Sequence, residues 1–222
     1  NVTLLFSQER YIEVADAFIA GLEDLATHAG DVSQVASVAS FFVSRIDTAV
    51  DAQIEARLKA TSSPEQQARL RSLLGKVAIA NSKLAYQRFK EVLKSPRWRA
   101  LQARDARPQR MLWASTSTKN PRYRDVLYVE ELIGAATIST LTPATMDAFR
   151  DHGQVRATLE EGVEDAQHVM DTLAEAGISI AEITDGCLNE GVQRFSDSLD
   201  QLLAAIRKKL ETAAIDRGER IR

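Results

Sequence analysis

The sequence predicts an α/β fold built on a parallel sheet. Four short segments are rich in apolar or β-branched residues and show no helical period. Amphipathic stretches lie between them, with apolar residues that recur at spacings of three and four. A strand that returns to the same edge through a helix pairs in parallel with the strand before it. This alternation fits either a doubly wound sheet or a (β/α)₈ barrel.

The predicted strands are residues 2–6, 35–43, 110–116 and 137–141. None of them is followed by GxGxxG or GxxxxGK[ST], so the nucleotide-binding doubly wound folds lose their usual support. A complete barrel has eight strands and usually needs ~250 residues. Because the 222 residues show only four strands, the barrel remains possible but its strand set is incomplete.

The helices are predicted from local start and stop signals. The first begins after Ser7, which is a good N-cap, and ends near Gly30. The region 45–103 is expected to form several helices rather than one. Its predicted breaks are SSP at 62–64, Gly75 and SPRW at 95–98.

Two further apolar stripes predict helices at the end of the chain. One runs from Leu159 to Leu173 and the other from Val192 to Leu210. We expect both stripes to cover a core rather than to bind a partner. Residues 1–222 contain no repeat, low-complexity tract or long linker, so a single domain is predicted.

Composition excludes several classes of function. The net charge is -3, from 28 basic and 31 acidic residues, which gives no global reason to expect a nucleic-acid or membrane partner. No apolar run approaches ~20 residues, and no signal segment is seen. One cysteine and three histidines give no disulfide and no metal-binding spacing. The sequence therefore predicts a cytoplasmic protein in a reducing compartment, without a metal or cofactor.

In parallel α/β sheets, functional residues collect at the carboxyl ends of the strands. On the first predicted strand Asn1 and Thr3 share one face. On residues alone a structural role is favoured, with Ser7 as a helix cap and Thr3 as a hydrogen-bonded barrel hydroxyl. The alternative is that both face a site.

The second strand places Ser40 and Phe42 on one face, followed by Arg45 at a helix start. A guanidinium there can bind phosphate together with nearby hydroxyls and helix N–H groups. A salt bridge from Arg45 to Asp47 or to another surface carboxylate is an alternative that composition alone favours about equally.

The third strand leads into the run RMLWASTSTKNP, which is dense in hydrogen-bond donors. Ser115, Ser117 and Lys119 could cradle an anion there, whereas a solvated turn is the alternative. The density of donors beside Trp113 favours the anion site.

Other polar residues are given structural interpretations. Asp47 and Asp51 form an i, i+4 acid pair that is expected to be solvated, Thr142 is expected to cap the helix beginning at Pro143, and His152 is expected to end that helix. Three lysines that recur every seven residues are read as the water-facing side of a helix, namely Lys76, Lys83 and Lys90.

Several motifs together resemble one family. In order along the chain they are NVTLLFSQERY, SVASFFVSRID, KLAYQRFKEV, LWASTSTKNP, DVLYVEELIG and TLTPATMDAFRDHG. They are similar to successive signatures of the longer bacterial transaldolases, strongly to about Gly153 and more weakly through NEGVQRF to the C-terminal helix. The resemblance implies a (β/α)₈ barrel that moves a dihydroxyacetone unit from sedoheptulose 7-phosphate to glyceraldehyde 3-phosphate. The reaction passes through a Schiff base on a lysine, without a cofactor.

The resemblance covers only the last four strands of such a barrel. The chain is therefore expected to be the C-terminal half of a (β/α)₈ TIM barrel with additional C-terminal helices, and the N-terminal strands of that barrel are expected to precede Asn1. The Schiff-base lysine and the acid/base aspartate and glutamate are expected upstream as well.

The resemblance also assigns roles to residues of this chain. Asn1 and Thr3 match the fifth strand of the family, where the threonine helps to position a catalytic water. Ser40, Phe42 and Arg45 match the sixth strand, with Arg45 as a phosphate ligand. The phosphate-site serine of the seventh strand corresponds to Ser115, and Lys119 stands in a loop of variable length.

Three functional hypotheses remain open. The first is a transaldolase, active when the chain is complete. The second is a non-catalytic phosphosugar-binding fragment or assembly half. The third is a different Schiff-base aldolase with Lys119 as its amine. In each case phosphorylated sugars are the expected partners, and a homo-oligomer is possible.

Overall fold

The computed structural model of the protein describes residues 1–219, and the side chains of residues 1–210 and 212. The chain divides into two compact units, Asn1–Cys187 and Leu188–Arg222. The first unit contains the sheet and the predicted site. The second unit is formed by the larger part of one helix. The expectation of a single domain stays a prediction.

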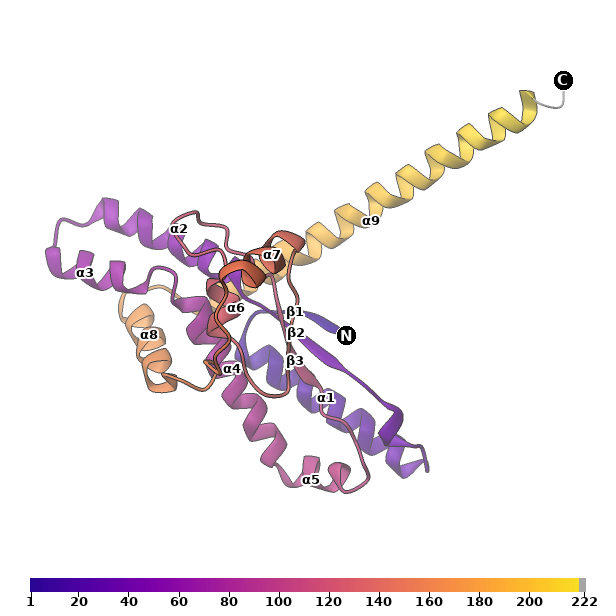
Figure 1. The fold of residues 1–222 in the computed structure, drawn as a ribbon, viewed down its shortest axis with the longest axis horizontal. Coiled ribbons are helices and arrows are strands. Elements are labelled where there is room, and N and C mark those ends of the chain that lie inside the picture. Colours follow the sequence, from indigo (N-terminus) through magenta and orange to yellow (C-terminus); the bar gives the residue numbers. More distant parts are fainter. Residues whose placement is uncertain (220–222) are drawn as a thin grey trace. The chain divides into compact units, whose positions relative to one another are not determined.

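The first unit is built on a four-stranded parallel sheet with the order β1-β2-β3-β4 (Figure 1). The strands are β1 (Val2–Leu5), β2 (Val38–Phe42), β3 (Arg110–Ala114) and β4 (Thr137–Ser139). All four predicted strands are confirmed, and each is shorter than predicted. The sequence-based prediction of an α/β fold with a parallel sheet is thus confirmed.

Strand β1 carries an irregularity close to the predicted site. Val2 pairs with Ala39 and Leu5 pairs with Phe41, so three steps along β1 match two steps along β2. Leu4 takes up the extra residue with a φ of 61°, in the left-handed region. This bulge shifts how the end of β1 meets β2.

The helices after the first two strands follow the predicted breaks. Helix α1 is Gln8–Thr27, and Ser7 caps it by accepting the Arg10 N–H at 3.2 Å. The region 45–103 forms four helices, and proline stands in the first turn of the second and fourth. They are α2 (Ser44–Ala60), α3 (Pro64–Leu73), α4 (Val77–Lys94) and α5 (Pro96–Gln102).

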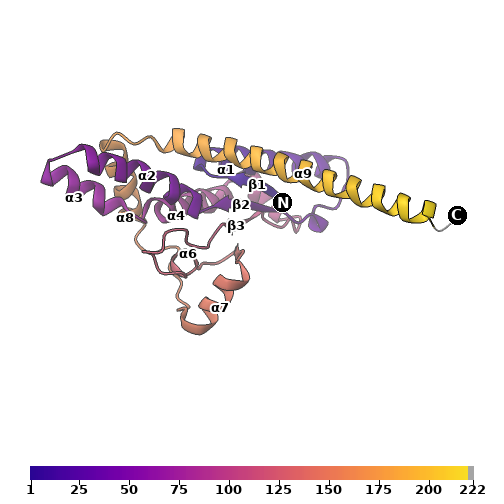
Figure 2. The ribbon, with the colours of Figure 1, turned by 90° about the horizontal axis from the view of Figure 1, so that it is seen from above.

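One face of the sheet packs into the helical core. Phe41 and Trp113 meet edge to face, with ring centroids 6.1 Å apart. Ala39 and Met111 lie on the same face and are fully buried. Because side chains alternate along a strand, Ser40, Phe42 and Leu112 point to the opposite face. Figure 2 shows α2, α3 and α8 gathered on one side of the strands, and α6 with α7 on another.

The remaining elements are η1 (Val32–Gln34), α6 (Leu127–Glu131), α7 (Pro143–His152), α8 (Val163–Glu175) and α9 (Ile180–Glu219). Thr142 caps α7 as predicted, by accepting the Thr145 N–H at 3.3 Å. Every helix within residues 1–219 is too short or too polar to span a bilayer.

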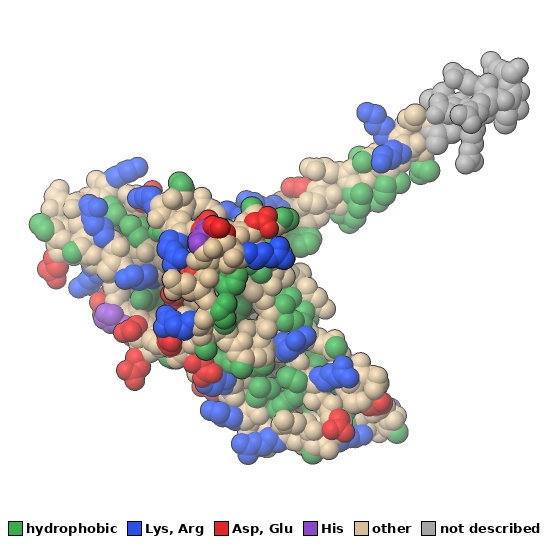
Figure 3. Space-filling model, in the orientation of Figure 1, with side chains coloured by type: hydrophobic (Ala, Val, Ile, Leu, Met, Phe, Trp, Pro, Cys, Tyr) green, Lys and Arg blue, Asp and Glu red, His purple; other side chains and the backbone are tan. Residues whose placement is uncertain are grey.

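The second unit carries the predicted apolar stripe of α9. Figure 3 shows hydrophobic side chains following one another along this helix. These side chains are exposed, from Val192 through Phe195 and Leu199 to Leu210. The second unit offers no other described element against which they could pack, and the expectation that they cover a core stays a prediction.

The prediction that Lys83 lies on the water-facing side of a helix is wrong. This lysine is 8% exposed, and its Nζ donates to Glu131 Oε2 at 3.2 Å and to the Glu161 carbonyl at 3.1 Å. The partners come from α6 and from the segment before α8. They allow the ammonium to be buried, because a buried charge is tolerated only when it is paired and hydrogen-bonded.

Candidate functional site

The carboxyl ends of β2 and β3 stay joined beyond the strands themselves. The Val43 N–H donates to the Ala114 carbonyl at 2.9 Å, and the Ser44 N–H donates to the Ser115 carbonyl at 3.0 Å. The hydroxyls of Ser44 and Ser115 also lie 2.9 Å apart. Ser115 has a φ of 56°, which turns the chain away from the sheet after β3. These contacts bring Ser115 to the first turn of α2.

Arg45 is the second residue of α2 and lies beside this pair of serines. Its guanidinium stacks over the Phe42 ring, 5.5 Å from the ring centroid. Among the described residues Arg45 has no ion pair, and the alternative of a salt bridge to Asp47 is wrong because Asp47 is buried and bonded elsewhere. The first turn of α2 has no side-chain cap in this part of the chain. A cation and two hydroxyls at the start of a helix together favour an anion.

The start of β1 meets the same face of β2. Ser40 is buried, and its Oγ donates to Asn1 Oδ1 at 2.8 Å. Thr3 is exposed, and its hydroxyl has no hydrogen-bond partner within residues 1–219. The interpretation of Thr3 as a hydrogen-bonded barrel hydroxyl therefore finds no support. Phe6 and Phe42, with ring centroids 5.1 Å apart, close the end of β1 against β2.

The three donors of the run after β3 lie in different surroundings. Ser115 contacts Ser44, whereas the Ser117 hydroxyl bonds Thr142 and Thr145 at the start of α7, at 3.1 and 2.7 Å. Lys119 is exposed and lines a cleft of about 190 Å³. The other cleft-lining residues are Asp47, Thr48, Asp51, Ala52, Glu55, Asn120, Tyr123 and Tyr128. The structure therefore does not gather Ser115, Ser117 and Lys119 around one point.

The acid pair of α2 is buried, so the prediction that it is solvated is wrong. Asp47 is 1% exposed, and burial raises the pKa of its carboxyl to about 7. Hydrogen bonds from the Ala78 N–H at 2.7 Å and from the Tyr128 hydroxyl at 2.8 Å act in the opposite direction. The cost of burying the charge outweighs these bonds.

Asp51, one turn further along α2, has a similar environment. It accepts the Tyr123 hydroxyl at 2.5 Å and the Gly75 N–H at 3.3 Å, and burial raises the pKa of its carboxyl as well. The sequence contained a signal for the burial of both acids. Asp47 directly follows Ile46 and Asp51 directly follows Val50, and both apolar residues belong to a fully buried stripe that continues to Ile54.

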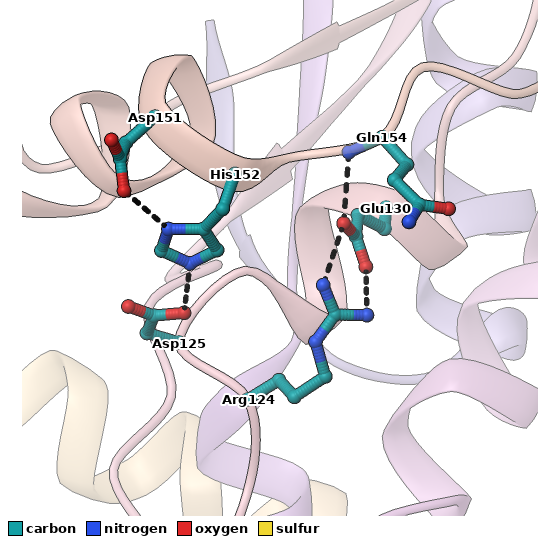
Figure 4. A network of polar contacts seen from close by, with 6 residues as sticks. All are labelled: Arg124, Asp125, Glu130, Asp151, His152 and Gln154. Carbon is teal, nitrogen blue, oxygen red and sulfur yellow. Dashed lines mark hydrogen bonds and ion pairs between the residues drawn. The ribbon is translucent and has the colours of Figure 1, made fainter.

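A second polar cluster joins the chain before α6 to the end of α7 (Figure 4). His152, the last residue of α7 as predicted, contacts Asp125 Oδ1 at 2.9 Å and Asp151 Oδ2 at 3.1 Å. Its hydrogen bond with Asp125 raises the pKa of the imidazole. Arg124 pairs with Glu130, which also accepts the Gln154 N–H at 2.9 Å.

Within the described part of the chain, no group of three or more His, Cys, Asp or Glu side chains is arranged to hold a metal ion.

The seven predicted site residues fall into two groups, with one residue apart from both. Asn1, Thr3 and Ser40 surround the β1–β2 contact, Phe42, Arg45 and Ser115 surround the start of α2, and Lys119 lines the acidic cleft.

Comparison with known proteins gives consistent matches. A family model described as Transaldolase/Fructose-6-phosphate aldolase matches residues 1–206. A protein named Transaldolase from Trichodesmium erythraeum is 46% identical over 213 residues, covering 95% of this chain and 56% of the relative. Proteins of the same name from Frankia alni and Parafrankia sp. are 46% and 48% identical, covering 97% and 96% of this chain and 56% of each relative. The chain thus spans little more than half the length of these relatives.

Proposed function

Because the chain belongs to the transaldolase/fructose-6-phosphate aldolase family, we propose that it forms part of a transaldolase. The proposed reaction transfers a dihydroxyacetone unit between sedoheptulose 7-phosphate and glyceraldehyde 3-phosphate, through a Schiff base on a lysine outside residues 1–222. The residues of this chain would then bind and orient the sugar phosphates. They would not supply the nucleophile.

We further propose that the chain is the C-terminal half of a (β/α)₈ barrel. Support comes from its four parallel strands in consecutive order, each followed by helix. Within residues 1–219, β1 and β4 each pair on one side only. The relatives are about twice as long as the matched region, which leaves room for the other strands in proteins of their size. A closed barrel would pair both edges.

The contact between Ser44 and Ser115 is the observation that carries the proposal. It places two hydroxyls at the first turn of α2, next to Arg45. A phosphate bound there would be fixed at one end of the sugar. Its binding energy, gained away from the reacting carbons, would orient the carbonyl toward the lysine. A cation such as Arg45 near the site would also favour the neutral, nucleophilic form of that lysine.

The other predicted residues take supporting roles in this proposal. Asn1, Thr3 and Ser40 lie along β1 and the facing part of β2, where the reacting carbons of the substrate would sit, and Thr3 has a hydroxyl free to hold a water. Phe42 supports the Arg45 guanidinium from below. Lys119 lines a cleft with three carboxylates, which favours an ion-pairing role over a phosphate contact or a nucleophilic amine.

The test uses the full-length protein with fructose 6-phosphate, borohydride and mass spectrometry. We expect an adduct outside residues 1–222, and an adduct on Lys119 would instead support a different Schiff-base aldolase. Arg45→Ala should lower kcat/KM for phosphorylated substrates. The loss of transition-state binding free energy should be about 1.5–3 kcal/mol, the contribution of one charge-assisted contact. The control is Arg88→Ala, which removes an exposed arginine paired with Glu91 on α4. Unchanged kinetics with both phosphosugars would remove Arg45 from the site.

A further inference from the structure

Helix α2 presents three acidic residues along one side, at positions i, i+4 and i+8. They are Asp47, Asp51 and Glu55, here called the acidic stripe. Each member binds one residue of the chain between β3 and the end of α6. The pairs are Asp47 with Tyr128, Asp51 with Tyr123, and Glu55 with Arg122. The chain after β3 therefore runs back along α2, opposite in direction to the helix.

The two buried carboxylates also reach a third part of the fold. Asp47 Oδ1 accepts the Ala78 N–H, and Asp51 Oδ1 accepts the Gly75 N–H, while the Oδ2 atoms accept the tyrosine hydroxyls. Asp51 thus uses one oxygen for the turn between α3 and α4, Asp47 uses one for the first turn of α4, and both use the other oxygen for the chain after β3. Because each buried carboxylate accepts two hydrogen bonds, the pair joins α2, the chain around the start of α4 and the chain after β3.

Gly75 provides an independent sign that this arrangement is close-packed. Its φ is +69°, and a Cβ added there would lie 2.7 Å from Cζ of the Tyr123 ring. The ring can approach the turn this closely only because residue 75 has no side chain. Tyr123 is therefore held both by its hydroxyl and by the close approach of its ring to the turn at Gly75.

The chain that is held in this way has little structure of its own. Residues 115–126 form neither helix nor strand, and a segment of this kind is ordered only if its contacts offset the entropy lost. This segment begins at Ser115, in the proposed phosphate site, and carries Lys119. The helix on the other side of the contact carries Arg45. Burial raises the pKa of both tyrosines, which keeps their hydroxyls protonated as donors.

We propose that Asp51, through Tyr123, and Asp47, through Tyr128 in α6, act as positioning residues that hold the 115–126 segment and the helix that follows it against α2, and so set the phosphate site between Arg45 and Ser115. None of the four needs to touch the substrate. The inference rests on the proposed function for the identity of the bound group. The anchoring itself rests only on the contacts of the acidic stripe.

The test compares Tyr123→Phe with Tyr128→Phe in the full-length protein, because phenylalanine keeps the ring and removes only the hydroxyl. Tyr86→Phe is the matched control, since the Tyr86 hydroxyl donates to the Ala135 carbonyl at 3.0 Å, away from α2. One readout is the rate of trypsin cleavage after Lys119 and Arg122, with and without inorganic phosphate. The second is KM for glyceraldehyde 3-phosphate compared with unphosphorylated glyceraldehyde.

We expect Tyr123→Phe to speed cleavage and to raise the phosphate concentration needed for protection by about fivefold to tenfold, the effect of about one hydrogen bond. KM for glyceraldehyde 3-phosphate should rise by a similar factor, while kcat and the kinetics with glyceraldehyde stay unchanged. Tyr128→Phe should act in the same direction, and Tyr86→Phe should not.

Two results would overturn the inference. One is cleavage of both variants at the wild-type rate. The other is a loosened segment with unchanged phosphate protection and an unchanged KM ratio. If the wild-type protein transfers no dihydroxyacetone unit but phosphate still protects the segment through Tyr123, the proposed function fails while the positioning role stands.

Discussion

The acidic stripe of α2 and the cluster around His152 both hold the chain that follows β3, yet their carboxylates behave in opposite ways. Burial raises the pKa of Asp47, which is 1% exposed. The pKa of Asp125, whose side chain is 59% exposed, is lowered by its hydrogen bond with His152. Removal from water dominates in the first case and the local partner in the second. The pKa values of these two carboxyls thus shift in opposite directions because one carboxyl is buried and the other is exposed.

This difference in burial determines how much each contact contributes to the free energy of unfolding. A donor left without a partner in the interior keeps its full desolvation cost, whereas water replaces a lost partner at the surface. Contacts of the acidic stripe should therefore be far more sensitive to substitution than those of the His152 cluster.

The largest effect is expected for Asp47→Ala. It leaves the Ala78 N–H and the Tyr128 hydroxyl without an acceptor in the interior. We expect the free energy of unfolding to fall by about 3 kcal/mol, the cost of stranding two buried donors. Urea unfolding at neutral pH measures it, with Asp125→Ala as the exposed counterpart. Equal losses in the two variants would contradict the comparison.

A smaller effect concerns pH. The pKa of Asp47 is about 7 in the folded protein against an ordinary value of 3.8, so the folded state binds more protons between about pH 4 and 7. The free energy of unfolding should therefore fall as pH rises through this window, with a slope of up to about 1.4 kcal/mol per pH unit from this group. Asp47→Asn cannot titrate and should flatten the slope.

Urea unfolding of wild type and Asp47→Asn across this window measures the difference. Asp51 titrates in the same direction and remains in both proteins, so the difference isolates Asp47. Parallel profiles would show that Asp47 is charged throughout.

The parts of the fold that depend on local signals were predictable from sequence. Ser7, Ser63 and Ser95 cap helices where the sequence places them, and proline begins α3 and α5. The alternation of apolar strands with amphipathic stretches was enough to predict the parallel sheet. Each of these signals lies within a few residues of its effect.

The site was predictable only in part, because its contacts join distant residues. Arg45, Ser40 and Ser115 were predicted as candidates from their places on or just after strands, and these roles stay predictions, but the link from Ser44 to Ser115 spans 71 positions. The burial of Asp47 depends on Tyr128, 81 positions away, and that of Lys83 depends on Glu131, 48 positions away. Sequence alone predicts that a charged residue beside an apolar stripe is solvated, because the distant partner that allows its burial is not visible in the local pattern.

The smallest effect is expected for His152→Ala, and it sharpens the comparison through salt. The pKa of His152 is raised by its hydrogen bond with Asp125, so the stability it contributes is fully present below the ordinary pKa and is lost as pH rises through the folded one. Both side chains are exposed to solvent, and dissolved salt weakens ion pairs at such exposed positions. The difference between wild type and His152→Ala should shrink from pH 6 to pH 8, and should also shrink when salt is added at pH 6. The difference produced by Asp47→Asn should respond much less to salt, because that carboxyl is buried. A His152→Ala difference that stays constant with pH and salt would mean that the imidazole acts by packing, and the contrast between the two clusters would then not be electrostatic.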